Sequence, residues 1–455
     1  MDITKQKYVL RFEADCQALT GLMLRSGRAG DFTDSSVEKT SDGRLFVNGY
    51  VWASLLRRAL SRCTNGQKLA QEWGKYAPDK IEVAPFWSES VFLRERDYMT
   101  VVNPGIRINR EWGAPESGAL YSDELAFPLV PLTFRCRVFF EEKSAAEAAA
   151  EALCDSLWVI SEGIETIGGG WSYGFGRLKP SAARWVILDL KESAERKQLW
   201  ASKVEGWHGK LDEMDLQRRE PEIATGKAWH RFKVWAGITE GQLLAIHTDV
   251  PEMGADIQDE LPDAFIFTRP TIRENGMLEA IPVVTGKAFR QAVLSREIER
   301  LLRTRGKACL NTSDPKREAT VPDASGKRRC NCKRCLWFGD ADAGGVIAVG
   351  DAPVEEGVSQ LIRRLQICEH SRQSMNNKFF NGEYLTGGNF TLDVIIDHSR
   401  QQDTASLELE KEVRELLGEM LKDSVAPPGW YRLGATTTCT GQIEVRSVTE
   451  YPSIL

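Results

Sequence analysis

The sequence predicts an α+β protein that consists of two successive units of similar organisation. The chain has 455 residues, which is too long for one typical domain. Strand-like segments and amphipathic helices also follow one another in the same order in the two halves. Such a recurrence indicates an internal duplication of a unit of roughly 190–230 residues. Two unrelated α+β domains are the alternative interpretation.

The first half combines strand-like segments with two segments of helical spacing. The strand candidates are residues 7–24, 44–50 and 132–140. The second helical segment, residues 144–160, is rich in alanine and has apolar residues on one face. In the first helical segment the apolar face is formed by Trp52, Leu55, Leu56, Ala59 and Leu60, and Arg57, Arg58 and Arg62 lie opposite.

The second half repeats this order after a charged stretch. Residues 190–226 are rich in Lys, Glu, Arg and Asp and are expected to form a helical connector. The strand candidates that follow are 229–246, 278–284 and 385–396, and the helix candidates begin at Thr285 and at about residue 405. We therefore divide the chain into a first module, 1–188, a connector, 189–226, and a second module, 227–455.

A glycine-rich loop ends the first module. Ile167–Leu178 contains five glycines together with Trp171, Ser172, Tyr173, Phe175 and Arg177. Glycine permits backbone conformations with positive φ and close approach of a partner. Exposed amides in such a loop suit phosphate, although a plain glycine-rich hairpin is the alternative. Residues 433–443 form a less complete copy near the C-terminus.

Composition narrows the class of protein. No stretch of about 18 uninterrupted apolar residues is present, so no transmembrane helix is expected. The N-terminus has no apolar segment typical of a secretory signal, which favours a cytoplasmic protein. The net charge of −6 argues against duplex DNA binding by bulk electrostatics. Residues 296–334 nevertheless hold 12 Lys/Arg against five Asp/Glu, a local charge of +7.

Three closely spaced cysteines predict a structural zinc site. Cys330, Cys332 and Cys335 have the spacing of metal ligands, and Cys309 can supply the fourth, with His370 as the fallback. The site would close an insertion at about residues 303–340, and surplus buried thiols are the alternative. The other cysteines are solitary and are expected to be reduced core residues: Cys16, Cys63, Cys136, Cys154, Cys368 and Cys439.

The order of these motifs resembles the RAMP superfamily of CRISPR effector proteins, specifically the Cas-seven-type backbone subunits of type III complexes. The resemblance rests on Leu120-Tyr121-x-x-Glu124 and on the loop from Gly168 to Arg177. It implies two tandem ferredoxin-like (RRM-like) modules with thumb hairpins and a zinc-knuckle insertion in the second. The pairing of two modules in one chain resembles the fused subunits of type III-D and III-E-like systems.

The resemblance also implies a cleavage site. Asp34 fits the position of the aspartate that cuts target RNA in nuclease-active members, and Asp31 is a nearby second carboxylate. A carboxylate with Mg²⁺ or another divalent ion can activate a ribose 2′-OH that is in line with its own phosphate. A loop-capping role is the alternative for Asp34. In the second half Thr268 is expected at the equivalent place, and Asp263 is close but off register, which predicts a single cutting site in the first module.

Nine positions are expected to contact RNA. A sheet beside an open groove suits RNA, with amides and arginines on phosphates and aromatic rings on bases. Ala53 stands where the family often has lysine, so the guide contact of the first helix is assigned to its arginines. The predicted set is Arg25, Arg57, Arg58, Gly169, Gly170, Ser172, Arg177, Lys287 and Arg290.

Together these features predict a backbone subunit of a type III CRISPR ribonucleoprotein effector. Its partners would be a guide crRNA, a complementary target RNA and other effector subunits, without a membrane. A nuclease-inactive RNA-binding subunit is one alternative. A guide-processing endoribonuclease is another, but such an enzyme needs a histidine-based acid/base site, and the five histidines are scattered.

Overall fold

The computed structural model divides the chain into two compact units. One comprises Met1–Gly105, Tyr121–Trp229 and Ile454–Leu455, and the other comprises Ile106–Leu120 and His230–Ser453. The structure describes residues 6–27, 33–73, 86–108, 115–199, 201, 206–207, 209–248, 265–272, 278–304, 321–322, 328–329, 333–339, 345–367, 374–400, 411, 415, 431–433 and 441–451.

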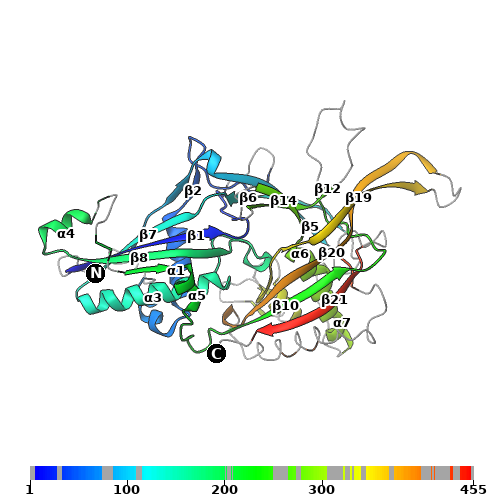
Figure 1. The fold of residues 1–455 in the computed structure, drawn as a ribbon. Coiled ribbons are helices and arrows are strands. Elements are labelled where there is room, and N and C mark those ends of the chain that lie inside the picture. Colours follow the sequence, from blue (N-terminus) through cyan, green and yellow to red (C-terminus); the bar gives the residue numbers. More distant parts are fainter. Residues whose placement is uncertain are drawn as a thin grey trace. The chain divides into compact units, whose positions relative to one another are not determined.

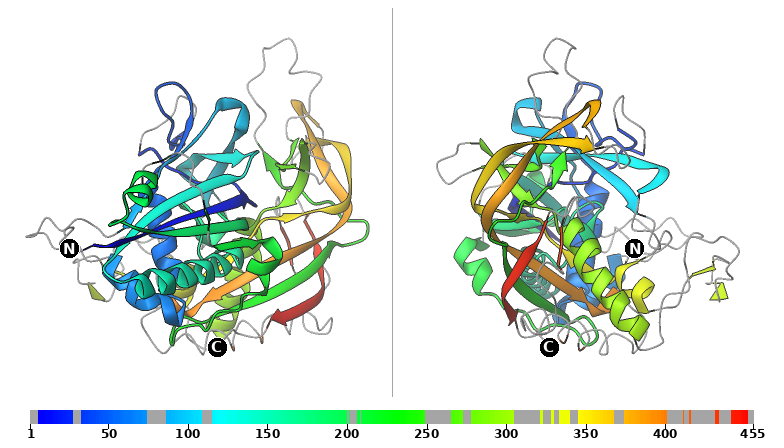
Figure 2. Two further views of the ribbon diagram at one scale, coloured as in Figure 1. Left: turned by 60° about the vertical axis from the view of Figure 1, so that its left-hand side comes forward. Right: turned by 90° about the vertical axis from the view of Figure 1, so that its right-hand side faces the viewer.

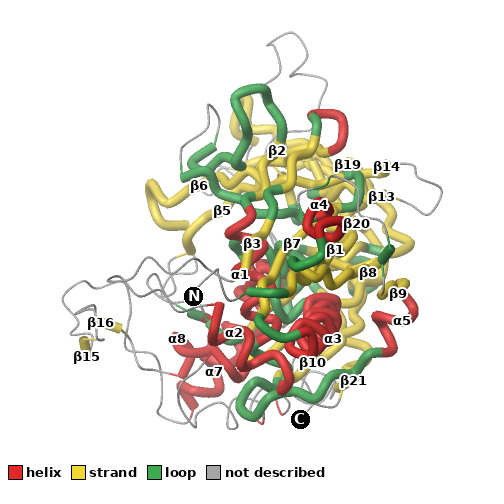
Figure 3. The backbone as a smooth tube through the Cα atoms, turned by 90° about the vertical axis from the view of Figure 1, so that its left-hand side faces the viewer, coloured by secondary structure: helices red, strands yellow, loops and turns green. Residues whose placement is uncertain are grey.

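The first unit is built on a five-stranded antiparallel sheet (Figure 1). Its strand order is β3-β7-β1-β8-β9. The bounds are β1 Tyr8–Ala18, β3 Phe86–Ser88, β7 Leu132–Phe140, β8 Leu178–Asp189 and β9 Gly209–Asp212. Helices α1 (Gly49–Leu60) and α3 (Lys143–Ser161) pack against each other, and α3 also packs on β1, β7 and β8 (Figure 3).

The apolar residues of these elements explain the packing. Successive strand residues point to opposite faces, so Leu10 and Phe12 of β1 share a face, and both are buried. Trp52 of α1 is buried too, and its ring stacks on that of Phe134 in β7 with centroids 3.3 Å apart. Burial of each such side chain contributes about 1.5–3 kcal/mol. This core fixes the face of α1 that carries the arginines.

The beginning of α1 is set by a capping residue. The side chain of Asn48 accepts a hydrogen bond from the amide of Tyr50, which satisfies one free donor of the first turn. At the other end Arg57 and Arg58 lie in the last turn, where positive charge complements the helix dipole. The predicted helix is therefore present, with its arginines at the C-terminal end.

Smaller elements complete the first unit. Short strand β2 (Leu45–Val47) pairs with β4 (Val91–Leu93), and β5 (Tyr98–Ile108) pairs with the longer β6 (Pro115–Pro128), the latter continuing into this unit from Tyr121. The helical elements are η2 (Thr64–Gly66), α2 (Gln67–Trp73), η3 (Glu95–Asp97), η4 (Trp171–Tyr173), α4 (Ser193–Gln198) and α5 (Glu213–Arg218).

The stretch 189–226 differs from the expected helical connector. It contains the short helices α4 and α5, but β9 lies between them and pairs with β8 at the edge of the first sheet. The stretch thus belongs to the first compact unit, which extends to Trp229. Strand β9 was not predicted because it has only four residues and is held by backbone pairing, so the charged sequence shows no clear periodic pattern there.

The second unit contains a related sheet of order β17-β20-β10-β21, with β19 also paired to β20. The bounds are β10 Trp229–Ile238, β17 Ile347–Val349, β19 Glu355–Ile367, β20 Ser374–Asp397 and β21 Ile443–Tyr451. Figure 2 shows β19 and β20 continuing beyond the sheet as a long two-stranded arm. The predicted helix at 405–421 lies almost entirely outside the described residues.

The helix that begins after Thr285 is continuous but changes its winding. It comprises α6 (Gly286–Ala288), a π-helical segment η5 (Phe289–Ser295) and α7 (Arg296–Thr304). The Thr285 side chain caps it by accepting from the amide of Ala288. The remaining elements are β11 (His247–Thr248), β12 (Phe265–Ile266), β13 (Thr268–Ile272), β14 (Leu278–Val284), β15 (Val321–Pro322), β16 (Arg328–Arg329), α8 (Lys333–Phe338), β18 (Ala352–Pro353) and η6 (His398–Arg400).

The two units repeat the same local contacts. In the first, the Gly176 amide donates to the Gly21 carbonyl, and Ile167 donates to Gly176. In the second, Gly441 donates to Leu243, and Leu433 donates to Gly441. The helix starts correspond as well, because the Gly49 amide donates to Ser90 Oγ and the Gly286 amide to Asp351 Oδ1. The sheets match in strand order, β3-β7-β1-β8 against β17-β20-β10-β21.

Among the described residues no helix is long and apolar enough to cross a membrane.

Candidate RNA interface

A short extended segment, Leu22–Arg25, contacts the Asp34 loop, strand β6 and the glycine-rich loop. Leu22 forms a bridge with Ala126 of β6, Met23 with Gly169 of the glycine-rich loop, and Arg25 with Val37 in the loop that follows Asp34. The Asp34 loop, β6 and the glycine-rich loop are therefore attached to one piece of backbone. Arg25, Asp34 and Gly169, which lie far apart in sequence, are brought into one region of the first unit.

Asp34 is exposed and is held in place by Ser122 of β6. The Asp34 amide donates to the Ser122 carbonyl (3.0 Å), and the Ser122 amide donates to Asp34 Oδ2 (2.6 Å). The Ser122 hydroxyl lies 3.3 Å from the same oxygen. Asp34 Oδ1 has no hydrogen-bond partner within the described part of the chain. One oxygen thus fixes the carboxylate, and the other is left to accept a proton or a cation.

Two further acids of β6 bind residues on either side of Asp34. Asp123 Oδ1 accepts from the Arg25 guanidinium (3.0 Å). Glu124 Oε2 accepts from the Val37 amide (3.0 Å), and Glu124 Oε1 accepts from Lys39 Nζ (3.0 Å). Burial raises the pKa of Glu124, but these hydrogen bonds together outweigh it, so the pKa lies below its usual value. Glu124 is therefore ionised at neutral pH and clamps the loop.

The glycine-rich loop uses many of its amides internally. Gly169 donates to the Met23 carbonyl (2.9 Å), and Tyr173 and Phe175 both donate to the Gly170 carbonyl. Phe175 is buried with Met23, Leu125 and Phe127, and the indole Nε1 of Trp171 donates to the Ile164 carbonyl. These aromatic rings pack into the first unit rather than present their faces to a base.

Part of the glycine-rich loop remains accessible. Gly168 is exposed, and Gly169, Gly170, Ser172 and Tyr173 are half-buried. Arg177 is half-buried as well, and its guanidinium lies close to Gly163. A Cβ added at Gly163 would lie 2.5 Å from Arg177 Nε. The face from Gly168 to Tyr173 is the part that a phosphate backbone can reach.

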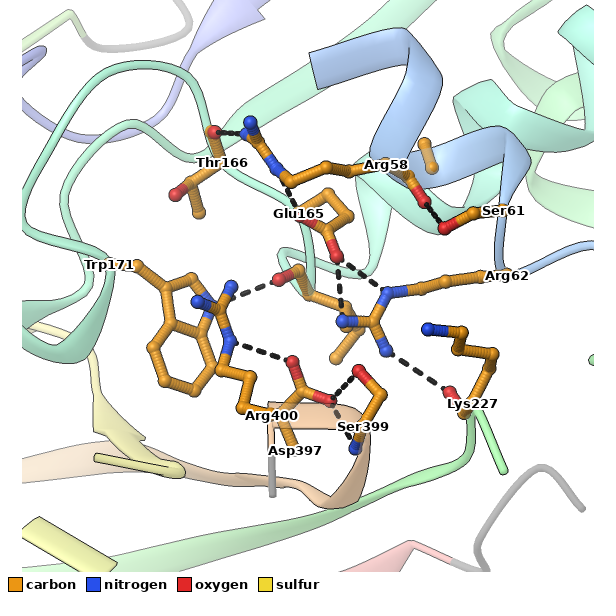
Figure 4. A network of polar contacts seen from close by, with 12 residues as sticks. Arg58, Ser61, Arg62, Glu165, Thr166, Trp171, Lys227, Asp397, Ser399 and Arg400 are labelled. Atoms are coloured by element: carbon orange, nitrogen blue, oxygen red, sulfur yellow. Dashed lines mark hydrogen bonds and ion pairs between the residues drawn. The ribbon is translucent and has the colours of Figure 1, made fainter. Parts of the chain in front are cut away.

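The two α1 arginines have different surroundings. Arg57 is exposed, and its guanidinium has no hydrogen bond or ion pair to any described residue. Arg58 is 39% exposed and is bound to Glu165 Oε2 (2.8 Å) and to the Thr166 carbonyl (2.8 Å) (Figure 4). Arg58 therefore fixes the entry to the glycine-rich loop, whereas Arg57 is available to bind phosphate.

Glu165 is the residue at the centre of this network. It is buried, and its Oε1 accepts from Arg62 Nε at 2.6 Å (Figure 4). Arg62 is also buried and donates to the Lys227 carbonyl (3.1 Å). Both Arg58 and Arg62 thus share one carboxylate, and the network joins α1 to the loop and to the end of the first unit.

The two predicted RNA contacts of the second unit, Lys287 and Arg290, also differ in accessibility. Lys287 is half-buried near the start of α6. Arg290 is only 2% exposed, and its guanidinium donates to the carbonyls of Ile347 (2.9 Å) and Phe338 (2.6 Å). The assignment of Arg290 to RNA is therefore corrected, because its charge is buried against backbone carbonyls of its own unit.

The position of Thr268 is also corrected. Lys39 forms a bridge with Leu45, beside a hydrogen bond from the Phe46 amide to the Glu38 carbonyl. Thr268 pairs with Pro282, beside the same bond from the Val283 amide to the Phe267 carbonyl. Thr268 is thus the counterpart of Lys39 and not of Asp34. The two loops differ in length, which is why alignment of the sequence motifs gave the wrong register.

The metal expectations fall mostly on residues that lie outside the described part of the chain. These are Cys309, Cys330, Cys332, the alternative ligand His370 and the second carboxylate Asp31. Cys335 is described and buried in α8. Within the described ranges no group of three or more His, Cys, Asp or Glu side chains could hold a metal ion. Asp34 Oδ1 alone can supply one oxygen ligand, and Mg²⁺ commonly uses one or two carboxylates together with substrate phosphates and water.

Sequence reasoning missed three residues that shape this region: Ser122, Glu165 and Lys39. Ser122 and Lys39 stand next to motifs that were recognised, but their partners are 88 and 85 residues away. Glu165 directly precedes the glycine-rich loop, and a lone acid there could have indicated an arginine partner. A sequence shows the charge of a side chain but not the residue that neutralises it.

Comparison with known proteins gives one family match, in the first unit. A comparison with curated proteins gives no match. Residues 15–179 match the family model described as the RAMP superfamily, a range that includes Asp34, Glu124 and the glycine-rich loop. Residues 15–179 are therefore similar to the RAMP superfamily.

Proposed function

We propose that the chain is a backbone subunit of a type III CRISPR ribonucleoprotein effector. In this role it binds a guide RNA and cuts the paired target RNA, with Asp34 as the catalytic residue. The observation that carries this proposal is the exposed Asp34 carboxylate, fixed by Ser122 within a segment that matches the RAMP superfamily. The chain order of the first sheet, β1-α1-β3-β7-α3-β8, supports the ferredoxin-like module that such subunits would use.

RNA binding would rest on the accessible surface around Leu22–Arg25. Arg25 is 57% exposed at its side chain, Arg57 is exposed, and the Gly168–Tyr173 face adds backbone groups. Arginines and amides of this kind bind phosphates without reading sequence. This fits a protein for which base pairing between guide and target supplies the specificity.

Cleavage would use the ribose of the target as the nucleophile. Asp34 Oδ1 accepts the proton of a 2′-OH, the 2′-oxygen attacks the adjacent phosphorus in line, and the P–O5′ bond breaks while the departing 5′-oxygen takes a proton from water. The products are a 2′,3′-cyclic phosphate and a 5′-OH. A divalent ion, when bound, would neutralise charge on the phosphate. The hydrogen bonds from Ser122 keep the carboxylate oriented and cost no reorganisation during the reaction.

The test is Asp34→Asn in the complete complex with guide and target RNA. We expect cleavage at one position to fall by at least about 100-fold because the general base is lost. Guide binding, measured by filter binding, should stay unchanged. Asp42→Asn is the matched control, since Asp42 is an exposed acid in the turn after Lys39 and pairs with Arg44. Unchanged cleavage by the Asp34 variant would favour a subunit that binds RNA without cutting it.

A further inference from the structure

The central strands of the two sheets share one irregularity, which aligns the sheets residue by residue. The register of β1 with β8 shifts directly after Asp15, and that of β10 with β21 shifts directly after Trp235. Each shift is a β-bulge that omits one residue of the neighbouring strand from the register, Ser181 in β8 and Arg446 in β21. Trp235 is therefore the counterpart of Asp15, and Arg446 is the counterpart of Ser181.

In the first unit the chain covers the outer face of its own sheet, which is the face opposite α1 and α3. Arg11 of β1 and Arg137 of β7 are on this face, because they alternate with buried apolar residues, and both are buried. Arg11 donates to the Ala201 carbonyl (2.9 Å), and Arg137 donates to the Leu199 carbonyl (2.9 Å). The residues that follow α4 thus lie against the outer face of the first sheet.

The outer face of the second sheet has two exposed aromatic side chains. Trp235 of β10 is 41% exposed, and Tyr451 of β21 is 40% exposed. Phe232 and Val234 belong to the core, so alternation along β10 places Trp235 on the opposite face. Arg231 lies on that face for the same reason, and its partner in the register is Tyr451. Both rings are therefore accessible on one face of the sheet.

Each of the two rings has a cation beside it. Arg446 Cζ lies 5.2 Å from the ring centroid of Trp235, and Lys233 Nζ lies 4.9 Å from that of Tyr451. Both distances are within the range of a cation–π contact. Gly237 makes room for the guanidinium, because a Cβ there would lie 2.7 Å from Arg446 Nη2. These contacts restrain the rings, so less side-chain entropy is lost when a ligand stacks on them.

The equivalent positions of the first unit have different chemistry. By the shared register the counterparts of the two ring–cation pairs are Asp15 with Ser181 and Val186 with Glu13. Neither of these pairs contains an aromatic ring or a cation. Glu13 instead accepts a hydrogen bond from Arg135 Nε (2.7 Å). The repeated fold alone therefore does not account for the ring–cation pairs of the second unit.

The charges on this face suit phosphate. The outward positions of β10 and β21 hold the cations Arg231, Lys233 and Arg446 and one acid, Glu444, which lies 3.5 Å from Arg446. Asp393 of the neighbouring β20 adds a second acid. Positive charge remains in excess, and both exposed rings lie beside a member of this cationic group.

We propose that the outer face of the second sheet binds an unpaired stretch of RNA, with Trp235 and Tyr451 stacking on bases and Arg446 and Lys233 binding phosphates. The two rings are four residues apart in the register, which corresponds to about 13 Å along the strands. RNA-binding sheets of similar topology stack two or three bases on such rings. The RNA must be unpaired, because bases within a duplex cover one another's faces. The inference extends the proposed function to RNA outside the guide–target duplex and does not depend on cleavage at Asp34.

The test is filter binding of a labelled single-stranded RNA that is unrelated to the guide. The complete complex is loaded with guide RNA beforehand, so that the guide surface is occupied. Trp235→Ala and Tyr451→Ala should each weaken binding of the probe by at least about 5-fold, because each removes one stacked base. Trp235→Phe retains a ring and should restore most of the affinity. Trp87→Ala is the matched control, since Trp87 is an exposed tryptophan of β3 in the other sheet.

The salt dependence separates the roles of the rings and the cations. Arg446→Gln should reduce the slope of log affinity against log salt concentration by about 0.7, because one phosphate contact to a single strand is lost. Trp235→Ala should leave that slope unchanged, since stacking releases no counterions. Equal slopes in the wild type and the Arg446 variant would contradict the phosphate contact.

Three outcomes would overturn the proposed RNA site. They are a wild-type complex that does not bind the probe, ring variants that bind it as the wild type does, and ring variants that bind it normally but change the sedimentation of the complex. The last result would assign the face to a protein subunit. Cleavage of paired target RNA should persist in every ring variant, so failure of this site is distinguished from failure of the function proposed for Asp34.

Discussion

At the scale of single residues, the arginines of α1 show how one side chain can be held for structure and its neighbour left for binding. Arg57 and Arg58 are adjacent in sequence, and charge alone does not distinguish them. Arg58 is bound to Glu165 and to the Thr166 carbonyl, while Arg57 has no such contact to a described residue. The difference is caused by the direction of each side chain from the helix, which the buried Trp52 face determines.

Glu165→Gln should destabilise the first unit strongly. The substitution removes the negative charge from a buried ion pair with Arg62, which is 3% exposed at its side chain, and breaking a buried ion pair typically costs about 3–5 kcal/mol. The measurement is urea unfolding followed by circular dichroism. Glu147→Gln is the control, because Glu147 pairs with Lys143 at 4.0 Å on the exposed surface and its loss should cost less than about 1 kcal/mol. Equal stability of the two variants would contradict the central role of Glu165.

At the scale of elements, the glycine-rich loop is defined by backbone conformation. Gly168, Gly170, Gly174 and Gly176 all have positive φ, which residues with a Cβ adopt only at a cost. At Gly176 a Cβ would also lie 2.0 Å from the Ile167 carbonyl oxygen, and at Gly441 it would lie 1.7 Å from that of Leu433. Both units therefore require glycine at this closing position, for the same two reasons.

Gly176→Ala should cost more than the conformational penalty alone. Gly226 has nearly the same φ, +74° against +75°, but nothing lies within 4 Å of its Cβ position. Gly226→Ala should thus cost about 1–2 kcal/mol, which is the price of the left-handed conformation. Gly176→Ala should exceed that value, because the carbonyl contact forces the loop to move. The comparison is made by chemical denaturation, and equal losses would show that the close approach contributes nothing.

Elements with a strong local pattern could be predicted from the sequence. The expected strand at 132–140 and the helix at 144–160 agree with β7, Leu132–Phe140, and α3, Lys143–Ser161. Strand β9 could not be found, because four residues at a sheet edge are fixed by pairing with β8. The register of the second loop could not be found either. It depends on the hydrogen bond between Ile266 and Glu383, which are 117 residues apart.

At the scale of the whole molecule, the described cysteines are all buried, and one of them, Cys335, belongs to the set proposed to bind zinc. Cys16, Cys63, Cys136 and Cys154 are buried and free. Burial raises the pKa of Cys63 and of Cys154 to about 12, and raises those of Cys16 and Cys136 further. Thiols that stay protonated and inaccessible do not react with disulfide reagents in the folded protein. Because these four thiols do not react, a change in the number of reactive thiols on removal of the metal can be assigned to the proposed metal ligands.

The purified protein is expected to contain about one zinc ion per chain, held by the four-cysteine set. Chelation should then release about four reactive thiols, since Cys309, Cys330, Cys332 and Cys335 would lose their metal while the buried set remains silent. Metal content is measured by mass spectrometry and thiols by a colorimetric disulfide reagent. Cys332→Ser should abolish the zinc content, whereas Cys154→Ala, a change in the buried set, should keep it. A metal-free wild type, or an equal thiol count before and after chelation, would favour surplus thiols. The +7 segment at 296–334 would then have to be held by contacts other than a metal.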